Sequence, residues 1–171
     1  KDVRDSREQQ TIAGIVQSVR TIAGKRGTFA VVALSDGQTT MDVLVFSKAY
    51  DNYKNILKPD EMLIFTGKGR KDERSGGMSF VCDKVITIEE MRVQKGATLM
   101  LEVAEGQSLN AIRDLLHSGQ VGEKGGVPCE VSISSKGVRA EVFLKNNCTP
   151  TDHLLNQLKN SESVSSARFV Y

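Results

Sequence analysis

The sequence predicts two domains, an all-β barrel followed by a smaller α+β domain. In residues 11–90, β-like runs alternate with polar turns, and only one short segment has helical spacing. From residue 95 onward, short β-like runs and helical stripes follow one another. A chain of 171 residues is long enough for two small domains. We therefore expect a barrel domain in residues 1–91, with a polar lead-in at 1–10, and a second domain in residues 92–171.

Three apolar runs with clear turns between them predict the first three strands. These runs are residues 12–22, 29–34 and 41–46. A basic turn with flanking glycines separates the first two runs, and the turn Ser35-Asp36-Gly37-Gln38 separates the second from the third.

A change of period then predicts a short helix. Aromatic and apolar residues recur at helical spacing at Tyr50, Tyr53, Ile56 and Leu57. Ser47 is a suitable N-cap, and Pro59 follows the end of the pattern. Two further strands, residues 62–69 and 78–88, complete the order β-β-β-α-β-β, which is the connectivity of an OB-fold barrel. In such a barrel we expect Gly14 and Gly67 to mark bends or close approaches between strands.

The second domain is predicted from shorter elements in the order β-α-β-β-α-β. Strands are expected at residues 98–103, 127–133, 138–144 and 164–170. Helical stripes are expected after Ser108 and after Thr149, the second stripe with Thr149 as its cap. This order predicts the split βαβ, ferredoxin-like arrangement, with residues 89–96 as the boundary between the domains.

The motifs of catalysis and metal binding are missing from the sequence. It has no phosphate-binding glycine loop, no nucleophile elbow and no His-Glu-x-x-His motif. Cys82, Cys129 and Cys148 form no Cys-x-x-Cys pair, so we expect buried thiols in a reducing environment. His117 and His153 lack the spacing of a ligand set. We therefore expect no enzymatic activity in this fragment, no cofactor, no bound metal and no contact with a membrane.

Two basic clusters are the most informative feature for function. The net charge is only +2, so a nucleic acid would have to bind to a local basic patch. In an OB fold, the loops between strands one and two and between strands four and five flank one ligand groove. The predicted nucleic-acid-binding residues in and beside these loops are Lys25, Arg26, Lys68, Arg70, Lys71 and Arg74. The alternative is that these residues are ordinary exposed turn residues. The four phenylalanines Phe29, Phe46, Phe65 and Phe80 are expected in the barrel core.

The sequence resembles the C-terminal region of the bacterial DNA polymerase III alpha subunit. The residues that carry the resemblance to its OB domain are Ile12-Ala13-Gly14-Ile15-Val16, Lys25-Arg26-Gly27, Val43-Leu44-Val45-Phe46, Tyr50, Tyr53 and Ser75-Gly76-Gly77. Those that resemble its last, tau-binding domain are Pro150, Asp152, Leu154, Leu155 and Leu158. Glu73-Arg74 departs from the acidic-aromatic pair common in that family.

The resemblance implies a non-catalytic part of a replicative polymerase in the bacterial cytoplasm, with the polymerase domains lying upstream. Its expected partners are single-stranded DNA, the tau subunit of the clamp loader and other replisome subunits. The residues expected to contact the protein partner are Leu154, Leu155, Leu158, Phe169 and Tyr171.

Two other functions remain open at this stage. An anticodon-binding OB domain of an aminoacyl-tRNA synthetase would share the early strand pattern and would prefer folded tRNA. A protein-interaction module built on an OB barrel would bind no nucleic acid, and the fold alone does not exclude it.

Overall fold

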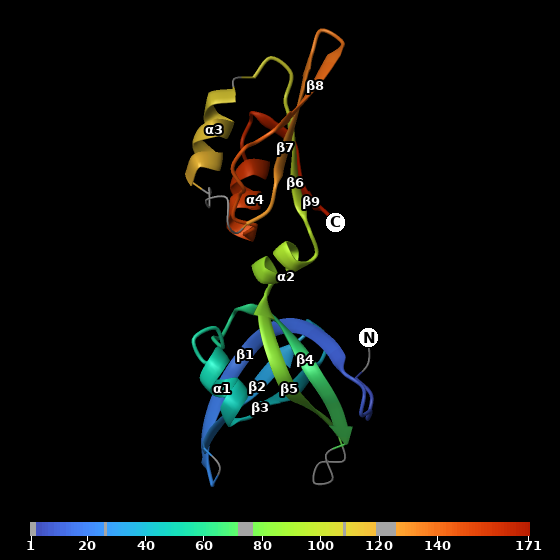
Figure 1. Ribbon diagram of the computed structural model, residues 1–171, viewed down its shortest axis with the longest axis vertical. Helices are drawn as coiled ribbons and strands as arrows, with labels where there is room; N and C mark the ends of the chain where they lie inside the picture. The colour runs from blue at the N-terminus through green and yellow to red at the C-terminus, as the bar shows by residue number, and fades with distance from the viewer. Residues whose placement is uncertain (1–2, 26, 72–76, 108, 119–125) are drawn as a thin grey trace. The chain divides into compact units, whose positions relative to one another are not determined.

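The computed structural model describes residues 3–25, 27–71, 77–107, 109–118 and 126–171 (Figure 1). Predictions for Arg26, Arg74, Ser108 and residues 119–125 fall outside these ranges. The chain forms two compact units, Lys1–Ile88 and Glu89–Tyr171. Among the described segments, no helix has both the length and the apolar character needed to cross a membrane.

The first unit is a closed barrel of five strands with one helix (Figure 1). Its elements are β1 (Gln10–Gly24), β2 (Gly27–Ser35), β3 (Thr40–Val45), α1 (Ser47–Tyr53), β4 (Met62–Lys71) and β5 (Met78–Thr87). The strands neighbour one another in the order β1-β2-β3-β5-β4, and β1 also pairs with β4. The pairing of β3 with β5 is parallel, and the other pairings are antiparallel. A closed barrel of this kind is consistent with the predicted OB fold.

Two glycines permit the close approach of strands that closes this barrel. A Cβ atom on Gly14 would lie 2.6 Å from the carbonyl oxygen of Ser35. A Cβ atom on Gly67 would overlap the carbonyl oxygen of Val81, and the β4–β5 register shifts between Thr66 and Gly67. The prediction that Gly14 and Gly67 lie at close approaches is confirmed.

Alternate strand residues fill the barrel. The buried cluster consists of Val16, Ala30, Val32, Leu34, Val43, Val45, Leu57, Leu63, Phe65, Phe80, Cys82 and Val85. Helix α1 begins at Ser47, with Phe46 at the N-cap position and no side-chain capping bond, so the prediction of Ser47 as N-cap is wrong. Ile56 and Leu57 follow the helix, although both still pack against the barrel core.

The turn between β2 and β3 is held by one carboxylate. Asp36 Oδ1 accepts backbone N–H bonds from Thr39 at 2.8 Å and from Gln38 at 3.0 Å. These two bonds, with that from Thr39 the stronger, hold the pKa of Asp36 below its ordinary value. This Asx turn occupies the position that the sequence predicted.

The second unit is a four-stranded sheet with two helices on one face (Figure 1). Its elements are α2 (Ile88–Gln94), β6 (Thr98–Val103), α3 (Leu109–Ser118), β7 (Cys129–Ser135), β8 (Val138–Phe143), α4 (Asp152–Lys159) and β9 (Val164–Val170). The sheet order is β8-β7-β6-β9. Its core contains Leu99, Leu101, Val103, Ile112, Leu116, Val127, Cys129, Val131, Cys148, Leu154, Leu158, Val164 and two alanines, Ala97 and Ala167.

The predicted split βαβ arrangement is wrong. Strands β6 and β7 are direct parallel neighbours, with Leu101 opposite Val131, whereas a split unit has another strand between them. Strand β8 lies at the edge instead. Its exposed Arg139 and Glu141 suit an edge strand, because an interior strand would bury more of its side chains. The order of elements along the chain was compatible with both arrangements.

The segment predicted as the domain boundary contains helix α2, whose Arg92 is buried in the second unit. Arg92 Nη1 donates to the Pro150 carbonyl and Nη2 to Asp152 Oδ1, both at 2.6 Å. Its guanidinium carbon lies 4.4 Å from the centre of the Phe169 ring. Arg92 therefore ties α2 to the start of α4 and to β9.

Helix α4 is capped by Thr151, two residues later than predicted. The Thr151 hydroxyl accepts the backbone N–H of Leu154 at 3.1 Å, which is the standard N-cap bond. Thr149, the predicted cap, precedes the helix. The prediction is wrong because Thr149 and Thr151 are both good caps, and tertiary contacts at Pro150 and Asp152 fix which of them is used.

All three cysteines are buried free thiols. Burial and the charge of Asp83 raise the pKa of Cys82 to about 12. The hydrogen bond with Cys148, and then burial, raise the pKa of Cys129. Because the thiolate is the reactive form, the raised pKa values of Cys82 and Cys129 disfavour their reaction near neutral pH.

Candidate nucleic-acid interface

A single row of side chains crosses the outer surface of the barrel over all five strands. Arg20 of β1 lies opposite Val31 of β2, and Val31 lies opposite Leu44 of β3. Leu44 is the partner of Val81 in β5, which in turn pairs with Lys68 of β4. Directly opposed residues share one face of a sheet, and their chain neighbours point into the barrel. This row runs around the closed barrel with a basic residue at each end. Between the two exposed basic residues, Val31 is buried, and Leu44 and Val81 are partly exposed. We call these five residues the outer strip.

An aromatic pair lies beside the outer strip. The ring centres of Phe29 and Phe46 are 5.7 Å apart, with an interplanar angle of 38°. Phe46 is 47% exposed. Together with Lys25 and Ser47, these rings line a surface groove of about 470 Å³. Their flat faces provide a surface on which nucleic acid bases can stack.

The expectation that all four phenylalanines are barrel core is therefore wrong for Phe29 and Phe46. Phe65 and Phe80 are completely buried in the core, as expected. Because Ala30 and Val45 point into the barrel, the alternation of a strand turns the adjacent Phe29 and Phe46 outward.

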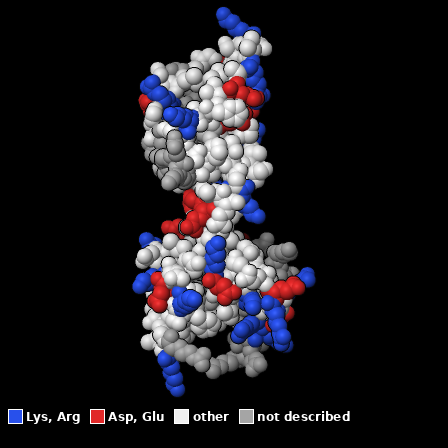
Figure 2. All heavy atoms as spheres, viewed as in Figure 1, with Lys and Arg blue, Asp and Glu red and all other residues white. Residues whose placement is uncertain are grey.

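The predicted basic residues that the structure describes are all exposed. Lys25 lies at the end of the β1–β2 hairpin, beside the aromatic pair. Lys68 and Arg70 are exposed on β4, and Lys71 is the last residue of that strand. Figure 2 shows basic side chains gathered near the lower end of β4, with acidic side chains among them. Arg26 and Arg74, the other two predicted residues, are not among the described residues.

The sequence did not indicate two further arginines. Arg20 ends the outer strip and pairs with Asp42 at 3.7 Å, and both side chains are more than half exposed. A pair this exposed is weak, so Arg20 remains available to a phosphate. Arg4 belongs to the predicted polar lead-in, which runs against β4, because Asp5 forms a parallel bridge with Gly69. The position of Arg4 beside the basic residues of β4 could not be predicted, because the sequence of residues 1–10 indicates only a polar segment of mixed charge.

The residues predicted to contact a protein partner differ in exposure. Leu154 and Leu158 are buried in the core of the second unit, where α4 packs on the sheet. Leu155 and Phe169 are partly buried, and Phe169 lies against Arg92. Tyr171 is 67% exposed. Of this set, Tyr171 offers the most surface to a partner.

The described barrel surface carries separated cations and an exposed aromatic pair. No three His, Cys, Asp or Glu side chains within the described ranges lie close enough together to hold a metal ion. The combination of separated cations and an exposed aromatic pair matches what a single nucleic acid strand presents. The phosphates of such a strand bind to Lys and Arg side chains, and its bases stack on aromatic rings.

Comparison with known proteins agrees with this description. Residues 10–93 match the family model described as an OB-fold nucleic acid binding domain. The chain is 28% identical over 161 residues to DNA polymerase III subunit alpha of Neisseria meningitidis serogroup A, covering 92% of this chain and 14% of that protein. With the same subunit of Escherichia coli K12 it shares 28% identity over 156 residues, covering 87% of this chain and 13% of that protein. The chain thus spans about one seventh of the length of these relatives.

Among solved structures, the chain matches the structure of RecG bound to a three-way DNA junction. The identity is 21% and the TM-score 0.43, over 51% of this chain and 12% of that chain.

Proposed function

We propose that this chain, which is similar over nearly its whole length to one part of the DNA polymerase III alpha subunit, holds single-stranded DNA on its OB barrel. The observation that supports the proposal most strongly is the outer strip, with its basic ends and the neighbouring Phe29–Phe46 pair. The matching family model is that of a nucleic-acid-binding OB domain. We place this function in the bacterial cytoplasm, within a replicative polymerase.

In this function the DNA backbone follows the cations, and the bases lie near Phe46 and the partly exposed Leu44. Lys68 and Arg70 at one side and Lys25 at the other contact phosphates, and a base stacks on Phe46. Phosphate contacts carry no sequence information, so the chain holds different sequences with similar affinity. The carboxylate of Asp42, next to Arg20, repels a phosphate, which keeps the affinity modest.

The second unit serves as the attachment to the tau subunit of the clamp loader and to other replisome proteins. Polymerase catalysis belongs to other parts of the parent protein. Tyr171 is the exposed residue we assign to the tau contact, whereas Leu154 and Leu158 are buried in the core of the second unit.

The anticodon-binding alternative has less support. The similarity to polymerase subunits extends over about nine tenths of the chain, and it includes the second unit. If the chain bound folded tRNA more tightly than an unstructured DNA strand of equal length, that alternative would replace our proposal.

Charge and aromatic substitutions in and beside the outer strip test the proposal. Lys68→Glu/Arg70→Glu is expected to weaken binding of a fluorescently labelled, unstructured oligonucleotide at least tenfold, because two phosphate contacts become repulsive. Phe46→Ala is expected to weaken binding about fivefold to tenfold, the effect of losing one stacked base. Fluorescence anisotropy titrations measure both effects.

The matched control is Lys95→Glu/Lys159→Glu, which makes the same charge change at exposed positions of the second unit. It should bind within about twofold of the wild type at 150 mM salt, where distant charges are screened. If this control weakened binding as much as the β4 variant, the affinity would reflect total charge, and the assignment to the outer strip would be wrong.

A further inference from the structure

Strand β8 leaves one edge of the second sheet open. It pairs with β7 on one side, and no described strand pairs with its other side. All six of its residues are exposed, including Val138 at 70% and Phe143 at 72%. An exposed strand edge with unpaired backbone groups is a template for the addition of another strand.

The hairpin turn determines which backbone groups face this open edge. Lys136 and Gly137 form a two-residue turn and both have positive φ, as in a type I′ turn. In such a hairpin the residues next to the turn form a hydrogen-bonded pair, here Ser135 with Val138. Because the pattern alternates, Arg139 and Glu141 direct their N–H and C=O groups outward, away from β7.

The sequence of β8 is complementary to itself in an antiparallel pairing. With a two-fold axis at Ala140, Arg139 of each copy lies opposite Glu141 of the other. Val138 then lies opposite Val142 on the other face of the strand. Shifting the register in either direction places Arg139 opposite Arg139 or Glu141 opposite Glu141, and like charges directly opposite are destabilising. The register centred on Ala140 therefore allows backbone hydrogen bonds between the two strands and also places opposite charges next to each other.

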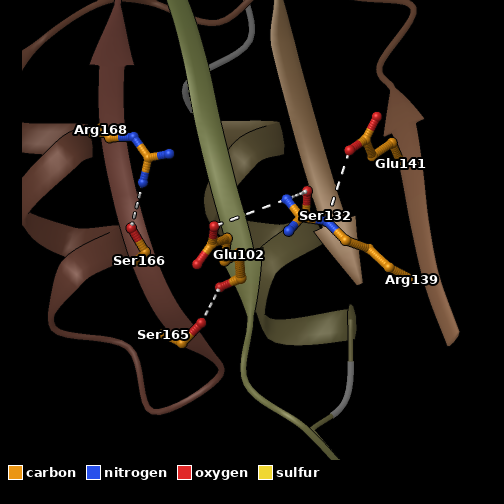
Figure 3. Close-up of polar contacts among 7 residues, drawn as sticks. All are labelled: Glu102, Ser132, Arg139, Glu141, Ser165, Ser166 and Arg168. Carbon is orange, nitrogen blue, oxygen red and sulfur yellow. Dashed lines mark hydrogen bonds and ion pairs between the residues drawn. The ribbon is translucent and has the colours of Figure 1, made fainter. Parts of the chain in front are cut away.

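The side chains on this edge are only loosely held within one copy. Arg139 Nε lies 3.7 Å from Glu141 Oε1 (Figure 3). Arg139 Nη2 donates to Ser132 Oγ at 3.0 Å and lies 4.0 Å from Glu102 Oε1. The Arg139 and Glu141 side chains are each more than half exposed, so their pair contributes little. In a dimer, Arg139 and Glu141 of one copy can therefore pair with Glu141 and Arg139 of the other copy at a small cost in free energy.

An apolar groove of about 260 Å³ lies directly beside β8. It is lined by Val142, Leu144 and Ile133 together with residues of α3. In the proposed register, Val138 of the second copy packs against Val142 at the rim of this groove. The pairing would thus remove two exposed valines from water in each copy, and this burial favours association.

We propose that a second copy of this chain adds to the sheet through β8, joining the two four-stranded sheets into one continuous sheet with a two-fold axis at Ala140. This inference does not depend on DNA binding. One pair of six-residue strands buries much less than the roughly 1,600 Å² of a standard interface. The dimer is therefore weak, with a dissociation constant on the order of 100 µM.

Charge reversal tests the register by sedimentation velocity over a concentration series. Arg139→Glu places two glutamates opposite each other and Glu141→Arg two arginines, so each is expected to weaken dimerisation at least tenfold. The double variant Arg139→Glu/Glu141→Arg restores opposite charges and should dimerise within threefold of the wild type. A monomeric wild type at 1 mM, or a double variant no better than the single ones, would overturn the proposal.

Cysteine cross-linking tests the position of the axis in protein whose fold is checked by circular dichroism. In this register Ala140 faces its own copy in a non-hydrogen-bonded pair, with Cα atoms about 4.5 Å apart, within the range of a disulfide. Ala140→Cys is therefore expected to form a covalent dimer under mild oxidation, because the three native cysteines are buried. Val142→Cys is the control and should stay monomeric, since it lies opposite Val138. Equal cross-linking of both variants, or of neither, would contradict the proposed axis.

Discussion

Replacing Gly67 with alanine is expected to destabilise the first unit by about 3 kcal/mol or more. The new Cβ atom would overlap the carbonyl oxygen of Val81 and lie 2.9 Å from the Phe80 ring. Neither neighbour can yield easily, because one is backbone and the other is completely buried. Strands β4 and β5 would have to separate locally, at the point where their register already shifts. The packing at Gly67 leaves no space for a Cβ atom.

Hydrogen exchange read by mass spectrometry measures this effect separately for peptides of each unit. Gly24→Ala is the matched control, since its new Cβ atom would lie 3.2 Å from the nearest atom, the Gly27 carbonyl oxygen at the end of a hairpin. The control is expected to cost less than about 1 kcal/mol. If Gly67→Ala left the protection of β4 and β5 unchanged, the account of barrel closure would be incorrect.

Replacing Arg92 with alanine is expected to destabilise the second unit by about 2–4 kcal/mol. The substitution removes two hydrogen bonds of 2.6 Å and the contact with the Phe169 ring. It also leaves the Pro150 carbonyl without this donor beside the start of α4. Helix α2 would then lose the two hydrogen bonds that join Arg92 to the start of α4. The exposure of Asp152, at 59%, keeps the expected loss below that of a fully buried ion pair.

Denaturant unfolding of the second unit, again followed by peptide-level exchange, measures the loss at Arg92. Arg168→Ala is the matched control, because this arginine of β9 is exposed and makes one hydrogen bond, of 3.2 Å, to Ser166 Oγ. It should cost less than about 0.5 kcal/mol. Arg92→Lys should fall between the two, since a lysine keeps the charge but loses the planar, two-pronged geometry. Equal effects of Arg92→Ala and Arg168→Ala would mean that Arg92 does not anchor α2.

The elements of the fold could be predicted from sequence better than their pairing. Alternating apolar residues and turn signals located the strands, and glycines inside strands at positions 14 and 67 pointed to close approaches. The sheet order of the second unit could not be read from the order β-α-β-β-α-β, because a hairpin partner can lie on either side of β7. The polar content of residues 138–141 was the available signal that β8 is an edge strand.

The candidate site was predicted in part. The loops of the OB connectivity pointed to Lys25 and the basic end of β4 from sequence alone, and the structure places these residues on the surface. Phe46 was missed because an apolar residue at the end of a strand is expected in the core. Only the observation that the preceding Val45 points into the barrel shows that Phe46 points outward. Arg20 was missed because it lies inside a strand, and only the register of β1 with β2 places it on the outer surface.

The salt dependence of DNA binding tests the central claim most directly. Affinity of the wild-type chain for a labelled, unstructured oligonucleotide would be measured by fluorescence anisotropy between about 25 and 300 mM salt. If Lys25, Lys68, Arg70 and Lys71 each neutralise one phosphate, log K should fall with log salt at a slope of roughly −3. A slope near zero, or no binding at the lowest salt concentration, would contradict the proposal that this barrel holds single-stranded DNA.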